Sequence, residues 1–367
     1  MKKKRVLFIM HLPPPIHGAS MVGKQIQNSR LVNDDFDCTY INMSASSHID
    51  DVGKFSINKL FFLVKNWTHC IATIIRLRPN LCYITPTSSG IAFYRDFLLI
   101  KSIQFLGTKT ILHFHNKPSE KWKSKKGNIV LLKQFFKGVK IILLGKELYP
   151  EKASFIKEQD VYYCPNGVES VAATPMTSLP KKEAINFLFL SNMIVEKGVH
   201  ILLLACKNLK KKQLQFKCDF VGDWKDISEK QFKQLVMEYG LQEEVHCHGP
   251  KYGDEKKVFF ENADVFVFPT YYRGETFGLV LLEAMDYSLP CIATINGAIP
   301  SVVQDGVTGF CINQKDSDAL TQKMLWCMKH PEKVREMGLA GKKRFEQFFT
   351  LEKFEKRFVS ILHDMIK

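Results

Sequence analysis

The sequence predicts an α/β protein built from two doubly wound parallel sheets. Short apolar runs alternate with longer stretches of helical periodicity along nearly the whole chain, as expected of repeated strand–helix–strand units. The 367 residues are enough for two domains. Near the middle of the chain, a segment rich in Pro, Thr and Ser at residues 170–182 interrupts the alternation and is typical of a linker.

In the first half of the chain, the alternation begins with the first residues. The expected strands are residues 6–10, 37–41, 81–84, 109–114, 140–144 and 161–164, and the expected helices are residues 19–31, 57–76, 91–106, 129–136 and 146–156. In a doubly wound sheet, ligands bind beyond the carboxyl ends of the strands. The turn at residues 13–20, which contains Gly18, follows the first strand, so its backbone N–H groups are placed to meet a phosphate or a sugar.

The second half repeats the alternation after the linker. Strands are expected at residues 185–191, 215–221, 245–248, 263–269 and 290–293, and helices at residues 199–209, 277–287 and 351–366. Apolar residues recur at helical spacing along the last helix, so one of its faces is expected to dock on a domain. These residues are Leu351, Phe354, Phe358, Ile361 and Leu362.

The composition describes a globular and strongly basic protein. A hydrophobic content of 46% with 24% charged residues excludes a disordered chain. The net charge of +15 implies an anionic partner, and since no recognised nucleic-acid motif is present, no nucleic acid is expected. The ten Cys form no CxxC pair, which argues against zinc and disulfides and favours the cytosol. No apolar run reaches the roughly eighteen residues of a spanning helix, and the basic start lacks a signal-peptide cleavage site.

The stretch at residues 271–289 (YYRGETFGLVLLEAMDYSL) carries the strongest chemical signals. Its helix is apolar on nearly every face and is expected to be buried, yet Glu283 lies within it and Glu275 just before it. A buried carboxylate without a partner costs several kcal/mol, so a partner or a ligand is required. A helix start also attracts phosphate. The N–H groups at this start belong to Thr276, Phe277, Gly278 and Leu279.

The spacing of the two glutamates limits what they can do together. Glu275 and Glu283 are eight positions apart, which corresponds to about 12 Å along a helix axis. That is too far for one shared proton or one metal ion, but it suits the two ends of an extended ligand with its phosphates between them. The alternative is a structural helix in which Glu283 forms an ion pair.

Further candidates lie at other strand ends. His113 and His115 are two residues apart, so they share one face of a strand while Phe114 takes the other; each is a structural histidine or a functional one. Lys197 lies near the start of the helix at 199–209, where a cation is unfavourable unless an anion joins it, and this favours a phosphate partner.

A basic loop at residues 117–126 surrounds Trp122. It is either a solvated loop or a contact with an anionic acceptor or membrane. The apolar helix at residues 57–76 either lies in such an interface or covers the sheet.

Taken together, these motifs resemble the family 4 retaining glycosyltransferases of the GT-B fold, of the bacterial surface-polysaccharide type. The matching features are the Gly18 loop, His115, PNGV at 165–168, EKG at 196–198, the Glu275–Glu283 pair, GAIP at 297–300 and DGVTG at 305–309. The resemblance implies two Rossmann-like domains facing a central cleft. It also implies that the last helix returns to the first domain, which gives domains at 1–165 plus 350–367 and at 183–349, joined by a linker at 166–182.

The resemblance also implies roles for individual residues. Glu283 would bind the ribose hydroxyls, and Glu275 would hold the transferred sugar. Lys197 would neutralise the leaving diphosphate, and His115 and the Gly18 loop would lie near the reacting centre. The remaining donor-binding candidates are Asn166, Asn192 and the amides of Thr276, Phe277, Gly278 and Leu279. Two positions depart from the family pattern: Asn192 stands where Arg is usual, and Ser301 stands where Glu is common.

The activity implied is retaining transfer of a sugar from a nucleotide-diphosphate sugar, with UDP favoured over GDP, to a saccharide or lipid-linked acceptor. No cofactor or metal is expected, because lysine and a helix start supply the positive charge. A cytoplasmic location is expected, peripheral to an anionic inner membrane face. Two alternatives share the fold: a nucleotide-sugar epimerase and a non-catalytic nucleotide-sugar-binding protein.

Overall fold

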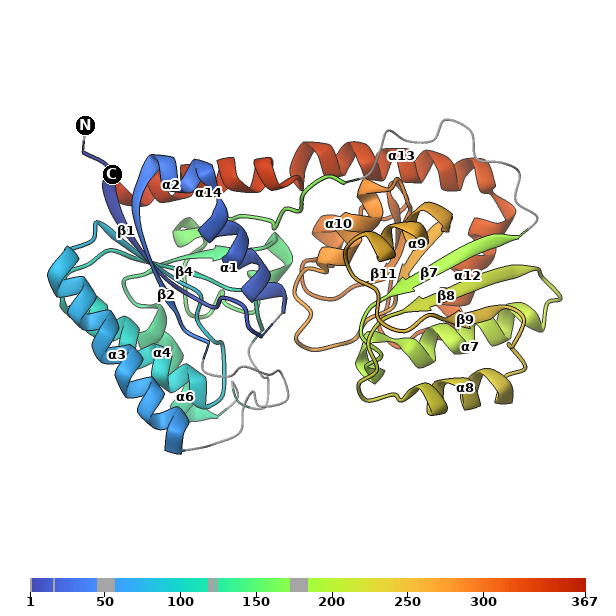
Figure 1. Ribbon diagram of the computed structural model, residues 1–367, viewed down its shortest axis with the longest axis horizontal. Helices are drawn as coiled ribbons and strands as arrows, with labels where there is room; N and C mark the ends of the chain where they lie inside the picture. Colours follow the sequence, from blue (N-terminus) through green and yellow to red (C-terminus); the bar gives the residue numbers. More distant parts are fainter. Residues whose placement is uncertain (1, 16, 45–56, 118–121, 123–124, 172–183) are drawn as a thin grey trace. The chain divides into compact units, whose positions relative to one another are not determined.

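In the computed structural model, the chain forms two compact units, described at residues 2–15, 17–44, 57–117, 122, 125–171 and 184–367. Unit 1 comprises Met1–Asn166 and Glu352–Lys367, and unit 2 comprises Gly167–Leu351. Each unit contains one parallel six-stranded sheet with helices on both faces (Figure 1). The prediction of an α/β fold with two doubly wound, Rossmann-like sheets is therefore confirmed.

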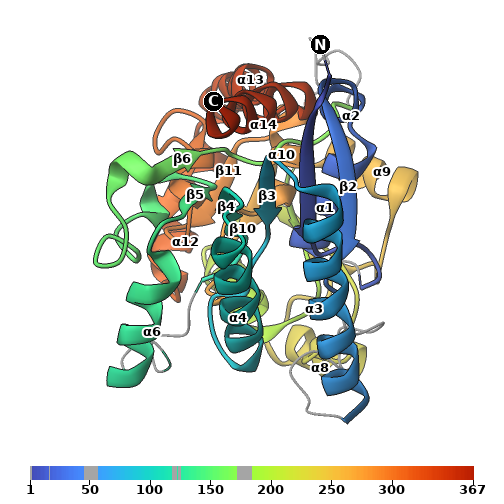
Figure 2. The ribbon, with the colours of Figure 1, turned by 90° about the vertical axis from the view of Figure 1, so that its left-hand side faces the viewer.

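The sheet of unit 1 has the strand order β2-β1-β3-β4-β5-β6, so the order reverses between β1 and β3. Its strands are β1 (Lys4–Met10), β2 (Phe36–Asn42), β3 (Leu81–Ile84), β4 (Thr110–His113), β5 (Lys140–Leu143) and β6 (Val161–Tyr163). Its helices are α1 (Gly18–Asn28), α2 (Arg30–Asp35), α3 (Ile57–Leu77), α4 (Ile91–Phe105), α6 (Lys126–Phe136) and α14 (Leu351–Ile366). Figure 2 shows α3, α4 and α6 side by side on one face, with α14 on the other.

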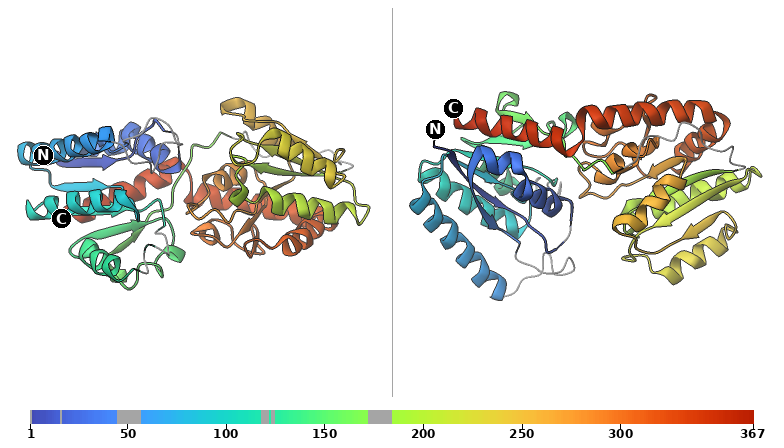
Figure 3. Two further views of the ribbon diagram at one scale, coloured as in Figure 1. Left: turned by 90° about the horizontal axis from the view of Figure 1, so that it is seen from below. Right: turned by 45° about the horizontal axis from the view of Figure 1, so that its top comes forward.

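The sheet of unit 2 has the order β12-β11-β10-β7-β8-β9, and here the order reverses between β7 and β10. Its strands are β7 (Ile185–Leu190), β8 (Phe216–Val221), β9 (Val245–Cys247), β10 (Val265–Phe268), β11 (Cys291–Thr294) and β12 (Gly309–Ile312). Its helices are α7 (Val199–Lys210), α8 (Glu229–Glu238), α9 (Lys257–Asn262), α10 (Leu279–Asp286), α11 (Ile299–Val302), α12 (Ser317–Lys329) and α13 (Pro331–Phe348). Helices α7 and α12 pack together on one face, and α10 packs against α13 (Figures 1 and 3).

The apolar stripe of α14 packs within unit 1. The Phe358 ring lies 5.1 Å from that of Tyr83 and 6.4 Å from that of Phe8, measured between centroids. Phe354 and Leu362 are also fully buried. This burial explains why the last sixteen residues group with the first unit in space although they follow the second in sequence.

One helix prediction for this chain was wrong, and two others missed a helix boundary. Residues 146–156 form a short 3₁₀ helix (Lys146–Leu148) followed by turns, because Pro150 supplies no N–H and cannot continue a helix. The helix expected at 19–31 is divided at Ser29, whose side chain caps α2 by accepting a hydrogen bond from the N–H of Val32. The helix expected at 277–287 begins only at Leu279, because Gly278 has a φ of 79°.

Helix α3 covers the sheet, which was one of its two predicted roles. Cys70, Thr73 and Ile74 are buried, and the helix contacts β1. Within the described ranges, no helix has both the length and the apolar character needed to cross a bilayer.

Part of the segment predicted as a linker is anchored to unit 2. Ser170 Oγ donates to Asp286 Oδ1 at 2.7 Å, and the N–H of Val171 donates to Asp286 Oδ2 at 2.8 Å. Asp286 is buried and also pairs with Lys342 at 2.7 Å. Residues 172–182 of the predicted linker lie outside the described residues, as do Lys121 and Lys123 of the basic loop.

Candidate functional site

In unit 2, the loops that follow β7 and β10 meet at the point where the strand order reverses. The N–H of Tyr271 donates to the carbonyl of Glu196 at 2.7 Å. Gly198 has a φ of 92°, and a Cβ at this position would lie 2.2 Å from the carbonyl oxygen of Pro269. Only glycine allows this approach without strain. The glycine of the EKG motif therefore lets the two loops pack in direct backbone contact.

The contact of these loops joins Lys197 to Glu275. Lys197 Nζ lies 2.6 Å from Glu275 Oε2, and each side chain is only 14% exposed. The ammonium group also lies 4.8 Å from the centre of the Tyr272 ring and 5.5 Å from that of Phe268. The anion that the sequence required near Lys197 is therefore present in the protein itself. The two residues are therefore in contact, whereas the resemblance implied that Glu275 meets the sugar and Lys197 meets the diphosphate.

The loop that carries Glu275 is held from the other side by the connection after β11. Asn296 Nδ2 donates to the carbonyl of Tyr272 at 3.0 Å, and the N–H of Ala298 donates to the carbonyl of Thr276 at 2.8 Å. The side chains of Thr276 and Phe277 are buried. Since α10 begins at Leu279, the amides of Thr276 and Phe277 belong to the loop and not to the helix. The GAIP motif thus shapes the loop of the first glutamate.

Glu283 lies in the second turn of α10 and is not fully buried, which corrects the expectation of a buried carboxylate. Its side chain is 27% exposed, and both of its oxygens accept hydrogen bonds of 2.8 Å from Lys256 Nζ. Lys256 ends a 3₁₀ helix (Gly253–Lys256) that leads into α9. The ion pair offered as the alternative interpretation of Glu283 therefore exists, and it faces solvent on one side.

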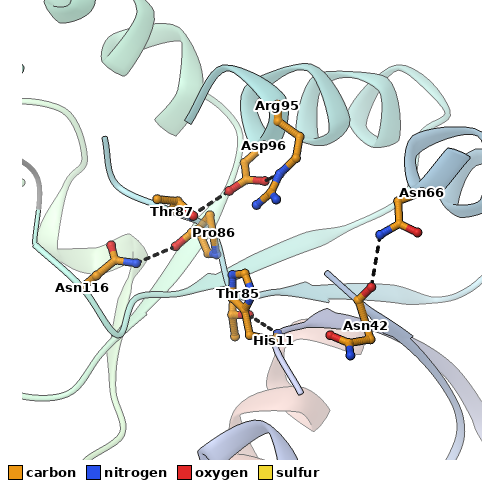
Figure 4. Close-up of polar contacts among 9 residues, drawn as sticks. All are labelled: His11, Asn42, Asn66, Thr85, Pro86, Thr87, Arg95, Asp96 and Asn116. Atoms are coloured by element: carbon orange, nitrogen blue, oxygen red, sulfur yellow. Dashed lines mark hydrogen bonds and ion pairs between the residues drawn. The ribbon is translucent and has the colours of Figure 1, made fainter. Parts of the chain in front are cut away.

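In unit 1, the loops at the corresponding reversal of strand order are linked by hydrogen bonds (Figure 4). The N–H of His11, after β1, donates to Thr85 Oγ1, after β3, at 3.2 Å. Asp96 Oδ2 accepts from the N–H of Thr87 at 2.8 Å, and Arg95 Nε donates to Asp96 Oδ1 at 2.6 Å. Asn116, after β4, donates from Nδ2 to the carbonyl of Pro86 at 3.3 Å.

Four histidines gather at this edge of the sheet. The rings of His113 and His115 lie 4.1 Å apart, so both point to one side as predicted, while Phe114 is buried on the other. The rings of His11 and His17 lie 6.1 Å apart. Burial lowers the pKa of His115 to about 3, with further lowering by His11 and His17. Burial, followed by the charge of Arg95, lowers the pKa of His11 to about 4. These imidazoles are neutral at physiological pH.

The remaining predicted residues lie in varied surroundings. Gly18 is the first residue of α1, and a Cβ there would meet nothing within 4 Å. The buried Asn166 ends the first stretch of unit 1, and its Oδ1 accepts no hydrogen bond from the described residues. Asn192 is exposed in the loop after β7. The structure therefore places Asn192 and Lys197 in the same loop, and it places Gly18 and Asn166 in the other unit.

Several residues at these sites escaped the sequence analysis. Lys256 pairs with Glu283, and His11 and Arg95 lie beside the predicted histidines. The only available signals were the position of His11 directly after a strand and the isolated lysines before α9, and both are common in sequences without a site. Asp286 was detectable as the second acidic residue, three positions after Glu283, in an otherwise apolar helix.

Comparison with known proteins finds similarity to glycosyltransferases. Residues 175–344 match the family model described as glycosyl transferases group 1. The match includes Lys197, Lys256, Glu275 and Glu283, but it covers slightly less than half of the chain. D-rhamnosyltransferase WbpZ from Pseudomonas aeruginosa is 31% identical over 165 residues, which are 45% of this chain and 41% of that protein. The chain spans about half the length of the curated relatives it matches.

The solved structures resemble the whole chain. A glycosyltransferase from Rickettsia africae has a TM-score of 0.76 at 18% identity, with all of both chains covered. Anabaena Alr3699/HepE in complex with UDP and glucose has a TM-score of 0.70 at 16% identity, with 98% of this chain and 99% of that chain covered. The GT-B fold is therefore shared with glycosyltransferases.

Proposed function

We propose that this protein is a retaining glycosyltransferase that moves a sugar from a nucleotide-diphosphate sugar to a saccharide or lipid-linked acceptor in surface-polysaccharide assembly. The observation that carries the proposal is the Lys197–Glu275 pair, held at 2.6 Å where the strand order of unit 2 reverses. Ligands of open α/β sheets bind at this point. The family match over the same residues and the UDP complex of a protein with this fold support a UDP-sugar donor.

In this proposal, each charged group acts on a different part of the donor. Lys197 meets the diphosphate, whose charge grows as the sugar departs, together with the N–H groups at the start of α10. Glu275 holds the transferred sugar and keeps the ammonium group of Lys197 oriented before the donor arrives. Glu283 binds the ribose hydroxyls, and the departing diphosphate assists in deprotonating the acceptor hydroxyl on the same face. To His115, in unit 1, the proposal assigns the role of a neutral hydrogen-bonding group in the transfer.

The division of roles between the two glutamates is tested with two conservative variants. Glu283→Gln should weaken binding of free UDP by about tenfold, the cost of a lost charged hydrogen bond. Glu275→Gln should bind UDP nearly as well as the wild type but lose at least about 100-fold in kcat, because its contact is realised mainly in the transition state. Calorimetry with UDP and a transfer assay with a UDP-sugar give the two readouts. Equal loss of UDP affinity in both variants would contradict the assignment.

The same assay separates transfer from the other activities open to this fold. Product that forms from nucleotide sugar alone, with no acceptor added, would indicate an epimerase, and binding without turnover would indicate a non-catalytic protein. Activity should persist in EDTA, since Lys197 and the helix start supply the positive charge. Loss of activity in EDTA that Mg²⁺ restores would show that a metal performs this task.

A further inference from the structure

The positive charge of this protein is concentrated in one stretch of the chain. Residues 52–146 contain 17 Lys and Arg but only two acidic residues, Asp96 and Glu120, and so carry the entire net charge of +15. The rest of the chain has 35 residues of each sign and is neutral. The charged stretch includes α3, α4 and α6, which lie side by side on one face of the sheet of unit 1 (Figure 2).

The outer side of α4 is apolar. Ile91, Leu98 and Phe105 are spaced seven residues apart, which is about two helical turns, so they lie on one side of the helix. They are 64%, 57% and 91% exposed, whereas Phe93 and Ile100 on the opposite side are buried. The inner side of α4 already supplies its buried residues. Burial in the core therefore does not explain the apolar row of Ile91, Leu98 and Phe105.

The neighbouring helices continue this surface. Val64 and Ile75 of α3 are more than half exposed and stand eleven residues apart, about three turns. Exposed residues at helical spacing form one stripe along α6 and its C-cap, namely Lys126, Val130, Lys133 and Lys137. We call these exposed residues of α3, α4 and α6 the outer face of unit 1.

The described residues of the three helices contain almost no acidic side chains to balance their cations. Among the described residues of the three helices, the only carboxylate is that of Asp96, which is buried and paired with Arg95. Lys101 donates instead to neutral groups, namely Gln104 Oε1 at 2.6 Å and the carbonyl of Lys137 at 3.3 Å. A surface of unbalanced cations around exposed aliphatic and aromatic side chains complements anionic headgroups over an apolar layer. A nucleic acid would meet the cations but would leave Leu98 and Phe105 without an apolar partner.

We propose that the outer face of unit 1 is a docking surface for an anionic lipid bilayer, with the α4 row inserted at the level of the headgroups and the lysines of α6 beside it. The surface deepens the proposed function, since a lipid-linked acceptor would be presented there. It rests, however, on the charge and exposure of unit 1 alone and not on the transferase site.

The proposal is tested by sedimentation of the full chain with vesicles, without nucleotide sugar. The wild type should bind vesicles that contain phosphatidylglycerol, and binding to pure phosphatidylcholine vesicles should be much weaker. Leu98→Ser/Phe105→Ser should weaken binding by about tenfold or more through lost apolar burial. Lys133→Glu/Lys137→Glu should also weaken binding, through lost attraction that is worth about fivefold per residue.

Matched controls come from unit 2, where Met237 and Leu339 are 64% and 47% exposed and Lys230 and Lys329 are exposed lysines. Met237→Ser/Leu339→Ser and Lys230→Glu/Lys329→Glu should bind vesicles like the wild type. Every variant should keep its affinity for UDP, so a failure of the transferase assignment would leave this result unaffected. Undiminished vesicle binding by the α4 variant would overturn the proposal. So would a wild type that ignores vesicles, or one that binds only a DNA or RNA duplex.

Discussion

At the residue scale, both candidate glutamates already have a lysine partner in the protein. Lys197 pairs with Glu275 in a mostly buried position, and Lys256 pairs with Glu283 in a half-exposed one. Removing one member of a buried pair leaves an uncompensated charge, which costs about 3–5 kcal/mol at full burial. An exposed pair contributes only about 0–1 kcal/mol. Loss of one partner should therefore destabilise the site more in the first pair, whereas the second pair is free to respond to a ligand.

Lys256 is expected to orient Glu283 for the nucleoside. Lys256→Met should weaken UDP binding about 3- to 10-fold while kcat changes little, because removal of one charged hydrogen-bonding partner costs about 1 kcal/mol and acts on binding alone. Lys256→Arg should restore most of the affinity. Calorimetry with UDP and steady-state kinetics provide the two numbers. If Lys256→Met leaves the UDP affinity unchanged, the pair is a surface salt bridge without a role in nucleotide binding.

At the scale of elements, the site depends on loops that approach one another closely at backbone level. Gly198 brings the loop after β7 against Pro269, and Gly297, with a φ of 58°, brings the loop after β11 against the backbone of Thr276. Both glycines adopt left-handed backbone conformations in which a side chain would also collide with a neighbouring carbonyl. The EKG and GAIP motifs are thus packing devices that hold Lys197 and Glu275 at contact distance.

Gly198→Ala is expected to disrupt the site and destabilise unit 2. The strained φ alone costs about 1–3 kcal/mol, and the collision with Pro269 adds to it. The urea midpoint should fall, and transfer activity should fall with it as Lys197 moves. Gly18→Ala is the matched control, since its Cβ would meet nothing within 4 Å, and its urea midpoint should not change. Equal tolerance of both substitutions would show that the loop contact is adjustable.

At the scale of the whole molecule, the two units differ in how many of their histidines have a lowered pKa. Among the histidines that the structure describes, five have a lowered pKa. Four of these lie in unit 1, namely His11, His17, His113 and His115, and burial is the largest cause in each. The fifth, His200, belongs to unit 2. The buried histidines therefore couple the stability of unit 1 to pH.

Acid unfolding is expected to begin in unit 1. Below pH 6.5 these histidines bind protons in the unfolded chain but not in the folded unit, whose pKa values for His11 and His115 are about 4 and 3. Stability is therefore complete above pH 6.5 and falls as the pH drops toward 4. Hydrogen exchange at pH 7 and pH 5 should show protection lost in β1 and β4 before β7 and β10. The reverse order, or equal loss in both units, would contradict this expectation.

Much of the fold is determined by local sequence, because hydrophobic periodicity and turn residues act over a few positions. The strand at residues 81–84 was predicted at its observed limits, and the full burial of β10 follows from its unbroken apolar run. Helix limits were less secure where a single residue decides them. Pro150, Ser29 and Gly278 each end or prevent a helix through backbone geometry that periodicity does not register.

From the sequence by itself, Lys197, Glu275, Glu283 and His115 could be selected as candidates, since charged or titratable residues next to buried strands and helices require a reason. Only the tertiary structure decided which of them meet. Lys197 and Glu275 are 78 residues apart and touch because β7 and β10 are neighbours in a sheet whose strand order reverses between them. Lys256 and Glu283 meet because the chain before α9 returns to α10. Such contacts depend on strand order and loop packing, which follow from the burial of whole sheet and helix faces. The residue types at the contacting positions do not indicate them.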